Sequence, residues 1–251
     1  MNTTFVNKDN LEYIKTLDDD SVDLIYFDPP FTITEAKYDK ALDWTNLWSE
    51  MWRVLKENRA VVIHCSQPFT FDLVASQRKY FKYNWYWDKI SSPTGFFFSK
   101  KQPLRILEEV CVFYKSSCLY NPQMTLKEKP VKCKKRKQNL TNYFPRAKSV
   151  DEKIYTHSYP THIIRMKRVK HKYSTRPVAL CEYFIKTYSN EGDTVLDLTC
   201  SNGQSAIACK NIQRNYIGVD IDENMINDAI SNFEKTFGED IQPSPIIIKE
   251  E

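Results

Sequence analysis

Residues 194–222 read TVLDLTCSNGQSAIACKNIQRNYIGVDID, and this stretch decides the fold. It contains two apolar runs, at 194–199 and 215–221, with a helical pattern at 204–212 between them. The order strand, helix, strand predicts a βαβ unit, in which the two strands are parallel members of one sheet. We therefore expect an α/β fold.

The connections of this unit carry residues that suit a ligand. Gly203 lies in the loop before the helix, where a glycine lets backbone N–H groups approach a bound group. Asp220 ends the second strand, where an acid can hold two ribose hydroxyls. These features are compatible with a nucleoside-containing cofactor, but also with an ordinary βαβ unit, because the loop has one glycine where dinucleotide-binding folds have three.

Other parts of the 251-residue chain repeat the alternation of strands and helices. Apolar or alternating runs predict strands, and apolar side chains at three- and four-residue steps predict helices. The expected strands are 22–27, 60–65, 82–89 and 109–115, and the expected helices are 11–17, 44–55, 69–80 and 177–188. The length suits a single main domain with a doubly wound, mainly parallel sheet. Residues after 222 give little signal for either a strand or a helix.

Two aromatic clusters each have two interpretations. Trp44, Trp48 and Trp52 share one stripe of the helix expected at 44–55, which favours a role in the core over base stacking. Residues 96–98 are three consecutive phenylalanines in a loop that also holds a glycine and three cations. Because exposed phenylalanine is costly, this loop either folds back on the core or meets a ligand.

The region from about 121 to 172 is polar, basic and punctuated by proline, which marks an inserted module or a flexible region. Between Lys127 and Lys153 there are ten cations against three acids, and the cluster 165–176 holds six cations and no acid. The rest of the chain is net acidic, although the whole carries a net charge of +4. Such a patch suits a polyanion, and the alternative is a solvated, lysine-rich loop.

The seven cysteines form no Cys-x-x-Cys pair beside which the four histidines could complete a zinc site. We therefore expect no zinc or other metal site, and a reducing compartment. The sequence has neither the cationic start and apolar core of a signal peptide nor an apolar run of about twenty residues. We expect a protein that is neither secreted nor inserted in a membrane.

The strand expected at 22–27 ends abruptly in Asp28-Pro29-Pro30-Phe31. In an open α/β sheet, ligands bind in the crevice outside the carboxyl ends of the strands. The two prolines lack N–H donors and stiffen the backbone, so Asp28 and the carbonyl groups make a site that only accepts hydrogen bonds. Together with the ring of Phe31, this site would match a planar base that carries an exocyclic amino group. A simple Pro-Pro turn after a strand is the alternative.

Asp28-Pro29-Pro30-Phe31 resembles the catalytic motif (D/N/S)PP(Y/F/W) of DNA methyltransferases that methylate amino groups. Its position before residues 194–222 resembles the permuted, β-class order, in which the catalytic motif precedes the cofactor motif. Residues 95–124, GFFFSKKQPLRILEEVCVFYKSSCLYNPQM, resemble a middle segment of phage- and prophage-type adenine-specific DNA methylases. The resemblance covers most of the chain outside about 125–170.

This resemblance implies a circularly permuted S-adenosylmethionine-dependent methyltransferase fold, with a mostly parallel sheet, an antiparallel edge and a basic target-recognition insert. The acceptors of the target amino group would be Asp28 and the Pro29 carbonyl, and Phe31 would stack on the base. Asp220 would hold the ribose of S-adenosylmethionine, and Asp9 would meet its adenine or amino group. The other expected cofactor-binding residues are Ser174, Thr175, Arg176, Asp197, Thr199, Cys200, Ser201, Asn202 and Gly203, with Ser174 and Arg176 near the methionine carboxylate.

The cofactor loop departs from the family pattern D-P-F-x-G-x-G-T. Residues 197–204 read DLTCSNGQ, so Thr199 replaces the aromatic residue and Ser201 replaces the first glycine. If the turn requires a positive φ at Ser201, this replacement costs about 1 kcal/mol. Asn202 and Gly203 tolerate left-handed geometry, which favours retention of cofactor binding.

The resulting hypothesis is a site-specific DNA methyltransferase that transfers a methyl group from S-adenosylmethionine to N6 of an adenine flipped out of double-stranded DNA. Cytosine-N4 is the alternative within the same chemistry; aspartate at the first motif position favours adenine by resemblance. A methyltransferase fold that has lost cofactor binding and serves as a DNA-binding module is a second alternative. Glutamine methylation of a protein is disfavoured by the permuted order and by the basic insert.

Three parts of the chain are expected: a catalytic half at 1–120, a basic target-recognition region at 121–172 and a cofactor-binding half at 173–251. Phosphate contacts are expected from Lys100, Lys101, Arg105, Lys132, Lys134, Lys135, Arg136, Lys137, Arg165, Lys167 and Arg168, and base contacts from Gln138, Asn139 and Asn142. The implied partners are double-stranded DNA, a second copy of the chain in a homodimer, and a cognate restriction endonuclease. The expected location is the cytoplasm of a bacterium or of a virus-infected host cell.

Overall fold

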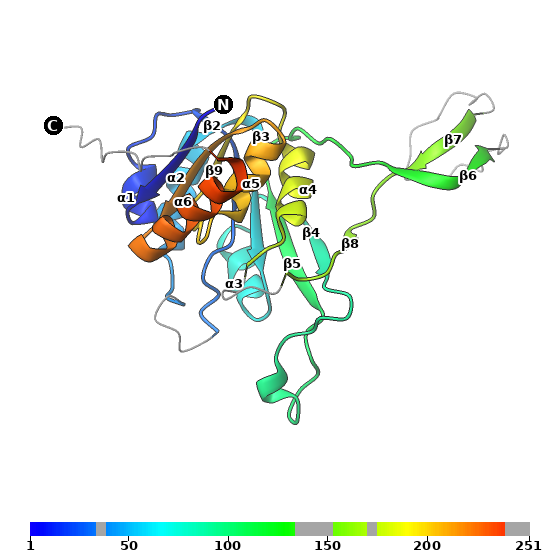
Figure 1. Ribbon diagram of the computed structural model, residues 1–251, viewed down its shortest axis with the longest axis horizontal. Helices are drawn as coiled ribbons and strands as arrows, with labels where there is room; N and C mark the ends of the chain where they lie inside the picture. The colour runs from blue at the N-terminus through cyan, green and yellow to red at the C-terminus, as the bar shows by residue number, and fades with distance from the viewer. Residues whose placement is uncertain (34–38, 134–152, 170–174, 239–251) are drawn as a thin grey trace. The chain divides into compact units, whose positions relative to one another are not determined.

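The computed structural model describes residues 1–33, 39–133, 153–169 and 175–238. The chain divides into two compact units (Figure 1). The first consists of Met1–Asn121 and His162–Glu251, and the second of Pro122–Thr161. The expected target-recognition region, 121–172, covers the second unit and continues into the first.

An eight-stranded mixed sheet forms the centre of the first unit. Its order is β1 (Thr3–Asn7), β10 (Asn215–Asp220), β9 (Thr194–Asp197), β2 (Val22–Phe27), β3 (Leu55–Cys65), β5 (Leu107–Phe113), β4 (Phe81–Asp88) and β8 (Ile163–Arg165). Neighbouring strands are parallel except where β5 pairs with β3 and β4. The predicted α/β fold with a mostly parallel sheet is therefore confirmed. The reversed strand lies between β3 and β4 rather than at the edge, because β4 and β8 continue the sheet beyond it.

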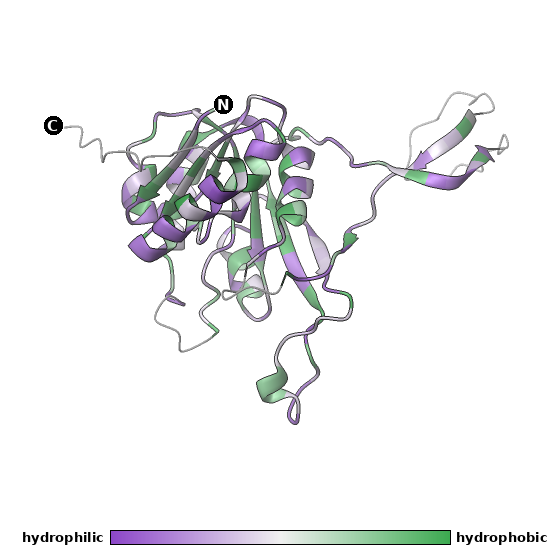
Figure 2. Ribbon diagram, in the orientation of Figure 1, coloured by the Kyte–Doolittle hydropathy of each residue, from purple (hydrophilic) through white to green (hydrophobic). Residues whose placement is uncertain are grey.

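Helices cover both faces of this sheet (Figure 1). Side chains alternate along a strand, so Leu24 and Tyr26 of β2 enter one core while Ile25 and Phe27 enter the other. The first core is closed by α4 (Val178–Tyr188), α5 (Gln204–Asn211) and α6 (Glu223–Phe237), and the second by α1 (Asn10–Ile14), α2 (Trp44–Val54) and α3 (Phe69–Ser76). In Figure 2 the middle strands are largely hydrophobic, whereas the helices carry both hydrophilic and hydrophobic residues.

The tryptophan stripe of α2 has the structural role that its spacing predicts. Trp48 and Met51 are buried, and Trp44 and Trp52 pack against the same core. Rings continue from there to the sheet edge: Phe69 lies beside Trp44, with ring centroids 5.8 Å apart. Through this contact, α2 packs against the residues that follow the carboxyl end of β3.

Two elements of the first unit are not anticipated from the sequence. β1 is a short edge strand in a segment for which no element was expected, and it pairs with β10. α6 lies in a segment that we expected to carry little signal, although Ile226, Ala229 and Phe233 recur at helical steps and are buried. Its ends carry standard caps, with the Asp222 side chain accepting from Asn224 N and Gly238 in the left-handed conformation.

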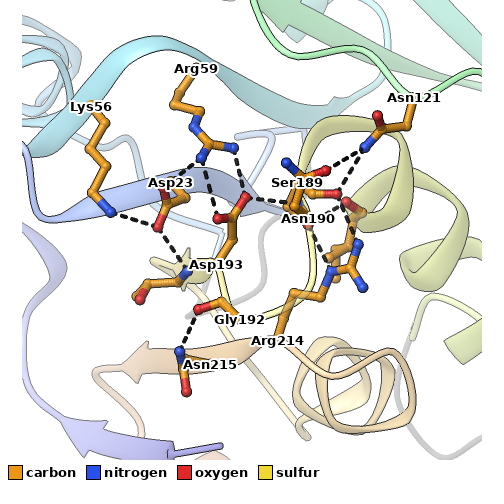
Figure 3. A network of polar contacts seen from close by, with 12 residues as sticks. Asp23, Lys56, Arg59, Asn121, Ser189, Asn190, Gly192, Asp193, Arg214 and Asn215 are labelled. Atoms are coloured by element: carbon orange, nitrogen blue, oxygen red, sulfur yellow. Dashed lines mark hydrogen bonds and ion pairs between the residues drawn. The ribbon is translucent and has the colours of Figure 1, made fainter.

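A buried ion network joins strands at the amino edge of the sheet (Figure 3). Asp23 of β2 pairs with Lys56 Nζ and Arg59 Nη2 of β3, each at 2.9 Å. Arg59 Nη1 lies 2.6 Å from Asp193 Oδ2, and Thr194 N donates to Asp23 Oδ2 at 3.0 Å. The network fixes the register of β2, β3 and β9, and so fixes where each of these strands ends.

The second unit contains an antiparallel pair, β6 (Thr125–Cys133) and β7 (Lys153–Ser158). The register shifts between Leu126 and Val131, which gives the longer strand an irregular bend.

Candidate active site

The carboxyl edge of the sheet brings together residues that are far apart in the sequence. β1, β10, β9 and β2 are parallel neighbours, so their carboxyl ends lie at the same edge. Asp28 follows β2, Asp220 ends β10, and the loop 198–203 follows β9. Thr199 Oγ1 donates to the Asp28 carbonyl at 2.9 Å, which joins the expected catalytic motif directly to the expected cofactor loop.

Phe31 is the outermost of three aromatic rings in contact, Phe31, Phe69 and Trp44. Its ring is stacked on Phe69, with centroids 5.4 Å apart and an interplanar angle of 20°. Phe69 is buried and contacts Trp44, while Phe31 is only half-buried. Phe69 therefore covers one face of the Phe31 ring, and the part of the ring that stays exposed can stack on a planar ligand.

Arg176 joins two carboxylates at this edge. Its Nη2 lies 2.7 Å from Asp28 Oδ1 and 2.8 Å from Glu108 Oε1, and the contact with Glu108 is an ion pair without the alignment of a hydrogen bond. The guanidinium lies over the Trp87 ring, with Cζ 5.9 Å from the centroid. Three sides of the guanidinium are thus held, which fixes the direction from which it meets Asp28.

Glu108, at the start of β5, is buried beside two cations, Lys89 and Arg176, and an imidazole, His64. Lys89 Nζ lies 2.9 Å from Glu108 Oε2, and His64 Nδ1 lies 3.6 Å from Oε1. Burial raises the pKa of Glu108, but Arg176, His64 and Lys89 outweigh it and hold that pKa well below its usual range. Glu108 is therefore a permanent anion that orients Arg176.

Burial and neighbouring charges shift the pKa of Asp28 in opposite directions. Burial raises the pKa of Asp28 above its ordinary value, and Arg176 and His64 lower it again in part. Arg176 in turn is desolvated, but the two carboxylates raise its pKa. Arg176 therefore favours the ionised form of Asp28, whereas burial favours the neutral acid.

Asp220 is held by backbone donors on both oxygens. Ser201 N donates to Oδ2 at 2.9 Å, and Asp222 N donates to Oδ1 at 3.0 Å. Burial raises the pKa of Asp220, and these two hydrogen bonds lower it. Each carboxylate oxygen keeps a further lone pair, so the carboxylate can still accept from a vicinal diol.

The loop 198–203 has the conformation of a ligand-binding turn. Ser201 has φ 46° and Gly203 has φ 82°, so both lie in the left-handed region. A Cβ on Gly203 would lie 3.0 Å from Ala229 Cβ, so only glycine lets α5 start this close to α6. Asn202 Nδ2 is buried and has no hydrogen-bond partner among the described residues. An unpaired buried donor beside the amino end of α5 suits a polar or anionic ligand group.

A family model matches most of the chain. The model for DNA methylase, that of the N6/N4 family, matches residues 22–231. The chain belongs to this DNA methylase family. Its fold and its family therefore agree with the resemblance of Asp28-Pro29-Pro30-Phe31.

Individual relatives of this DNA methyltransferase agree with the family. Type II methyltransferase M.HpaI of Haemophilus parainfluenzae is 24% identical over 253 residues, covering 94% of this chain and 76% of the relative. The crystal structure of the M1.HpyAVI-SAM complex has a TM-score of 0.60 at 21% identity, covering 92% of this chain and 99% of that one. PvuII DNA methyltransferase, which is cytosine-N4-specific, has a TM-score of 0.64 at 14% identity, covering 91% and 85%. At these identities the solved structures establish the fold.

The other residues expected at the cofactor site of this methylase have varied positions. The Asp9 side chain caps α1 by accepting from Leu11 N and Glu12 N, and Lys8 N donates to Asp220 O, so Asp9 lies at the same edge. Asp197 is buried and accepts from Thr199 N, Ser205 Oγ and Tyr216 Oη. The Cys200 side chain packs in the core, so only the backbone of this loop residue is available to a ligand. Thr175 is half-buried beside Arg176, and Ser174 lies outside the described residues.

The cations expected to meet DNA fall into three groups. Lys100 and Lys101 are exposed in the loop between β4 and β5, with Arg105 half-buried in the same loop. The carboxyl end of β8 carries Arg165, which pairs with Asp88 at 3.4 Å and is largely exposed, followed by Lys167 and Arg168. Lys132 is exposed on β6 of the second unit, and Lys134, Lys135, Arg136, Lys137, Gln138, Asn139 and Asn142 lie outside the described residues.

The sequence interpretation missed Glu108, Lys89 and His64. These side chains lie at or near strand ends, and Glu108 directly precedes the run 109–115 that predicts β5. An acid that opens a buried strand was the available signal, but its partner could not be named without the strand order.

The described residues contain no group of three or more His, Cys, Asp or Glu side chains placed to hold a metal ion. Across the same described ranges, no helix has the length and apolar composition to cross a membrane.

Proposed function

We propose that this DNA methyltransferase transfers a methyl group from S-adenosylmethionine to the N6 amino group of an adenine flipped out of double-stranded DNA. The observation that carries the proposal is the position of Asp28-Pro29-Pro30-Phe31 at the carboxyl end of β2, bonded through Thr199 to the expected cofactor loop. The order of the two motifs along the chain is that of the permuted β-class, and residues 95–124 resemble phage- and prophage-type methylases.

The target amino group would bind to acceptors alone. Asp28 Oδ and the Pro29 carbonyl accept its two hydrogens, which directs the nitrogen lone pair away from them. Pro30 has no N–H and holds the turn rigid, and the free face of Phe31 stacks on the base. Catalysis would then consist of orientation and acceptor placement, while Asp28 stays ionised through Arg176.

The residues at the ends of β1, β9 and β10 fit S-adenosylmethionine. Asp220 would hold the ribose hydroxyls, Asp9 the adenine or amino group, and Asn202 Nδ2 with the amino end of α5 the carboxylate. The cofactor supplies a methyl group on a positively charged sulfur, which is a strong electrophile. The orphaned Asn202 donor is the feature of this chain that a bound acceptor would satisfy.

DNA contacts would come from the cations at the carboxyl edge and on the second unit. Lys100, Lys101 and Arg165 would hold phosphates near the flipped base, and Lys132 with its neighbours would add contacts from the target-recognition region. A homodimer, a cognate restriction endonuclease and a cytoplasmic location in a bacterium or a virus-infected host cell complete the proposal.

Cytosine-N4 is the second candidate, because the N6/N4 family and the fold shared with cytosine-N4-specific PvuII methyltransferase include that chemistry. Aspartate at position 28 favours adenine by family resemblance. The distinguishing experiment incubates the wild-type protein with unmethylated genomic DNA and S-adenosylmethionine labelled on the methyl group. We expect label in N6-methyladenine at one sequence context; label in N4-methylcytosine alone would contradict the adenine assignment, and no label would contradict the activity.

A further inference from the structure

The loop between β4 and β5 exposes three consecutive aromatic rings. Phe96, Phe97 and Phe98 form the short helix η1 (Phe96–Phe98) and are 64%, 91% and 45% exposed. The rings of Phe97 and Phe98 meet edge to face, with centroids 5.1 Å apart. Because nine-tenths of Phe97 lies in water, packing of the core does not explain this run.

The tip of the loop has a defined structure. Thr94 and Arg105 pair through Thr94 N to Arg105 O at 2.8 Å and Arg105 N to Thr94 O at 2.9 Å, which closes a neck. Lys101 N and Gln102 N both donate to Phe98 O, and Gly95 turns the chain with φ 90°. The three rings are therefore presented at the end of a hydrogen-bonded hairpin, which extends beyond β4 and β5 in Figure 1.

The neck leaves the sheet at the edge that holds Asp28. β4 ends and β5 begins at the carboxyl edge of β2 and β3, because β5 is the reversed strand. Lys89 at one side of the neck pairs with Glu108 at the other at 2.9 Å, and Glu108 contacts Arg176, which contacts Asp28. The hairpin and the catalytic motif thus face the same side of the first unit.

The surroundings of the rings are cationic. Lys100 and Lys101 follow the phenylalanines directly and are exposed, and the sequence from 90 to 107 contains no acidic residue. Exposed rings beside exposed lysines match a polyanion with an apolar interior, and duplex DNA has phosphates outside and stacked bases inside.

We propose that residues 96–98 are a wedge that enters the base stack of double-stranded DNA beside the target base, with Phe97 as the inserting ring. This inference rests on the proposed function. Lys100 and Lys101 hold the adjacent phosphates, and Phe97 fills the space that the flipped base leaves. Insertion thereby lowers the cost of unpairing the target.

The test compares Phe97→Ala, Phe97→Trp and the control Phe71→Ala on short duplexes that carry the sequence context found with genomic DNA. Phe71 is also highly exposed, at 72%, but lies on α3. For Phe97→Ala we expect kcat/KM to fall about tenfold or more on a matched duplex, and to recover to within about twofold of the wild type when the target adenine faces a mismatch, since a mispaired base is already easier to extrude. Phe97→Trp and Phe71→Ala should behave as the wild type.

A second measurement reports whether the target base leaves the stack. With 2-aminopurine at the target position of a matched duplex, the wild type should raise the fluorescence on binding, and Phe97→Ala should reduce that rise at saturating protein. Because Phe97 is exposed, an unchanged thermal unfolding curve is expected for the variant.

The outcomes separate the wedge from the proposed function. No methyl transfer by the wild type would overturn both. Transfer by the wild type with an unchanged Phe97→Ala, or a defect of equal size on matched and mismatched duplexes, would overturn the wedge alone. A wild-type dimer that Phe97→Ala converts to a monomer without DNA would identify the tip as a contact between copies of the chain, and would also overturn the wedge.

Discussion

Arg176 Nη2 lies 2.7 Å from Asp28 Oδ1, so the first residue of the proposed catalytic motif is ion-paired to a residue 148 positions later in the chain. Glu108 and Trp87 hold the other sides of this guanidinium. The pairing means that the acceptor strength of Asp28 depends on a cation that lies outside the motif. Ionisation of Asp28 is therefore set by the balance between its burial and Arg176.

Replacing Arg176 by methionine should shift the pH dependence of methyl transfer. The ionised carboxylate of Asp28 is a stronger acceptor for an amino group than the protonated acid, so activity should rise as pH passes its pKa. Burial raises that pKa and Arg176 lowers it, so the variant should have a still higher pKa and its acid limb of kcat/KM should move to higher pH. Arg78→Met, at an exposed position of the same residue type, should leave the limb in place. An acid limb that does not move in Arg176→Met would contradict this role.

Replacing Ser201 by glycine should stabilise the cofactor loop. Ser201 has φ 46°, where a side chain costs about 1 kcal/mol that glycine avoids. We expect a higher midpoint of urea unfolding and a dissociation constant for S-adenosylmethionine that is equal or lower, measured by calorimetry. Ser49→Gly, inside α2, should have the opposite effect on stability, because glycine is unfavourable within a helix. A destabilised Ser201→Gly would show that the loop is not strained.

Replacing Asp197 by asparagine should remove part of the pH dependence of stability. Burial raises the pKa of Asp197 from 3.8 to about 7, although hydrogen bonds from Ser205 and Thr199 lower it. Between these values the folded chain holds a proton that the unfolded chain has lost, so the free energy of unfolding falls as pH rises, by up to about 1.4 kcal/mol per pH unit. Below about pH 4 and above about pH 7 this contribution is constant.

Urea unfolding from pH 4 to pH 8 measures this difference. The slope should be smaller in Asp197→Asn than in the wild type, and Asp72→Asn, at an exposed position on α3, controls for the loss of one carboxylate. If the free energy of unfolding had the same slope against pH in the wild type and in Asp197→Asn, Asp197 would not titrate in this range.

The sequence contained enough information to place the proposed catalytic motif but not its partners. The apolar run 22–27 and its abrupt end predict a buried strand and a site at its carboxyl end, and Asp28 lies there. Asp220 and the loop with Gly203 also lie at that edge, because a βαβ unit makes its strands parallel. These predictions needed only local patterns.

The Arg176–Glu108 pair depends on strand order, which local patterns do not encode. β5 is inserted in reverse between β3 and β4, and this reversal brings Glu108 to the carboxyl edge. β1 was missed because an edge strand of five residues has too few positions to show alternation. α6, in contrast, had a helical period and caps at Asp222 and Gly238 that were present in the sequence.

The most direct test of the account replaces Asp28 by alanine, with Asp28→Asn as the matched variant that retains an acceptor oxygen. Methyl transfer to duplex DNA and binding of S-adenosylmethionine are measured on the same preparations. We predict that Asp28→Ala lowers kcat at least about a hundredfold, as expected for loss of an orienting group, while the dissociation constant of the cofactor stays within about threefold of the wild type. Asp28→Asn should keep measurable activity. Wild-type turnover by Asp28→Ala would contradict the central claim that this carboxylate positions the target amino group.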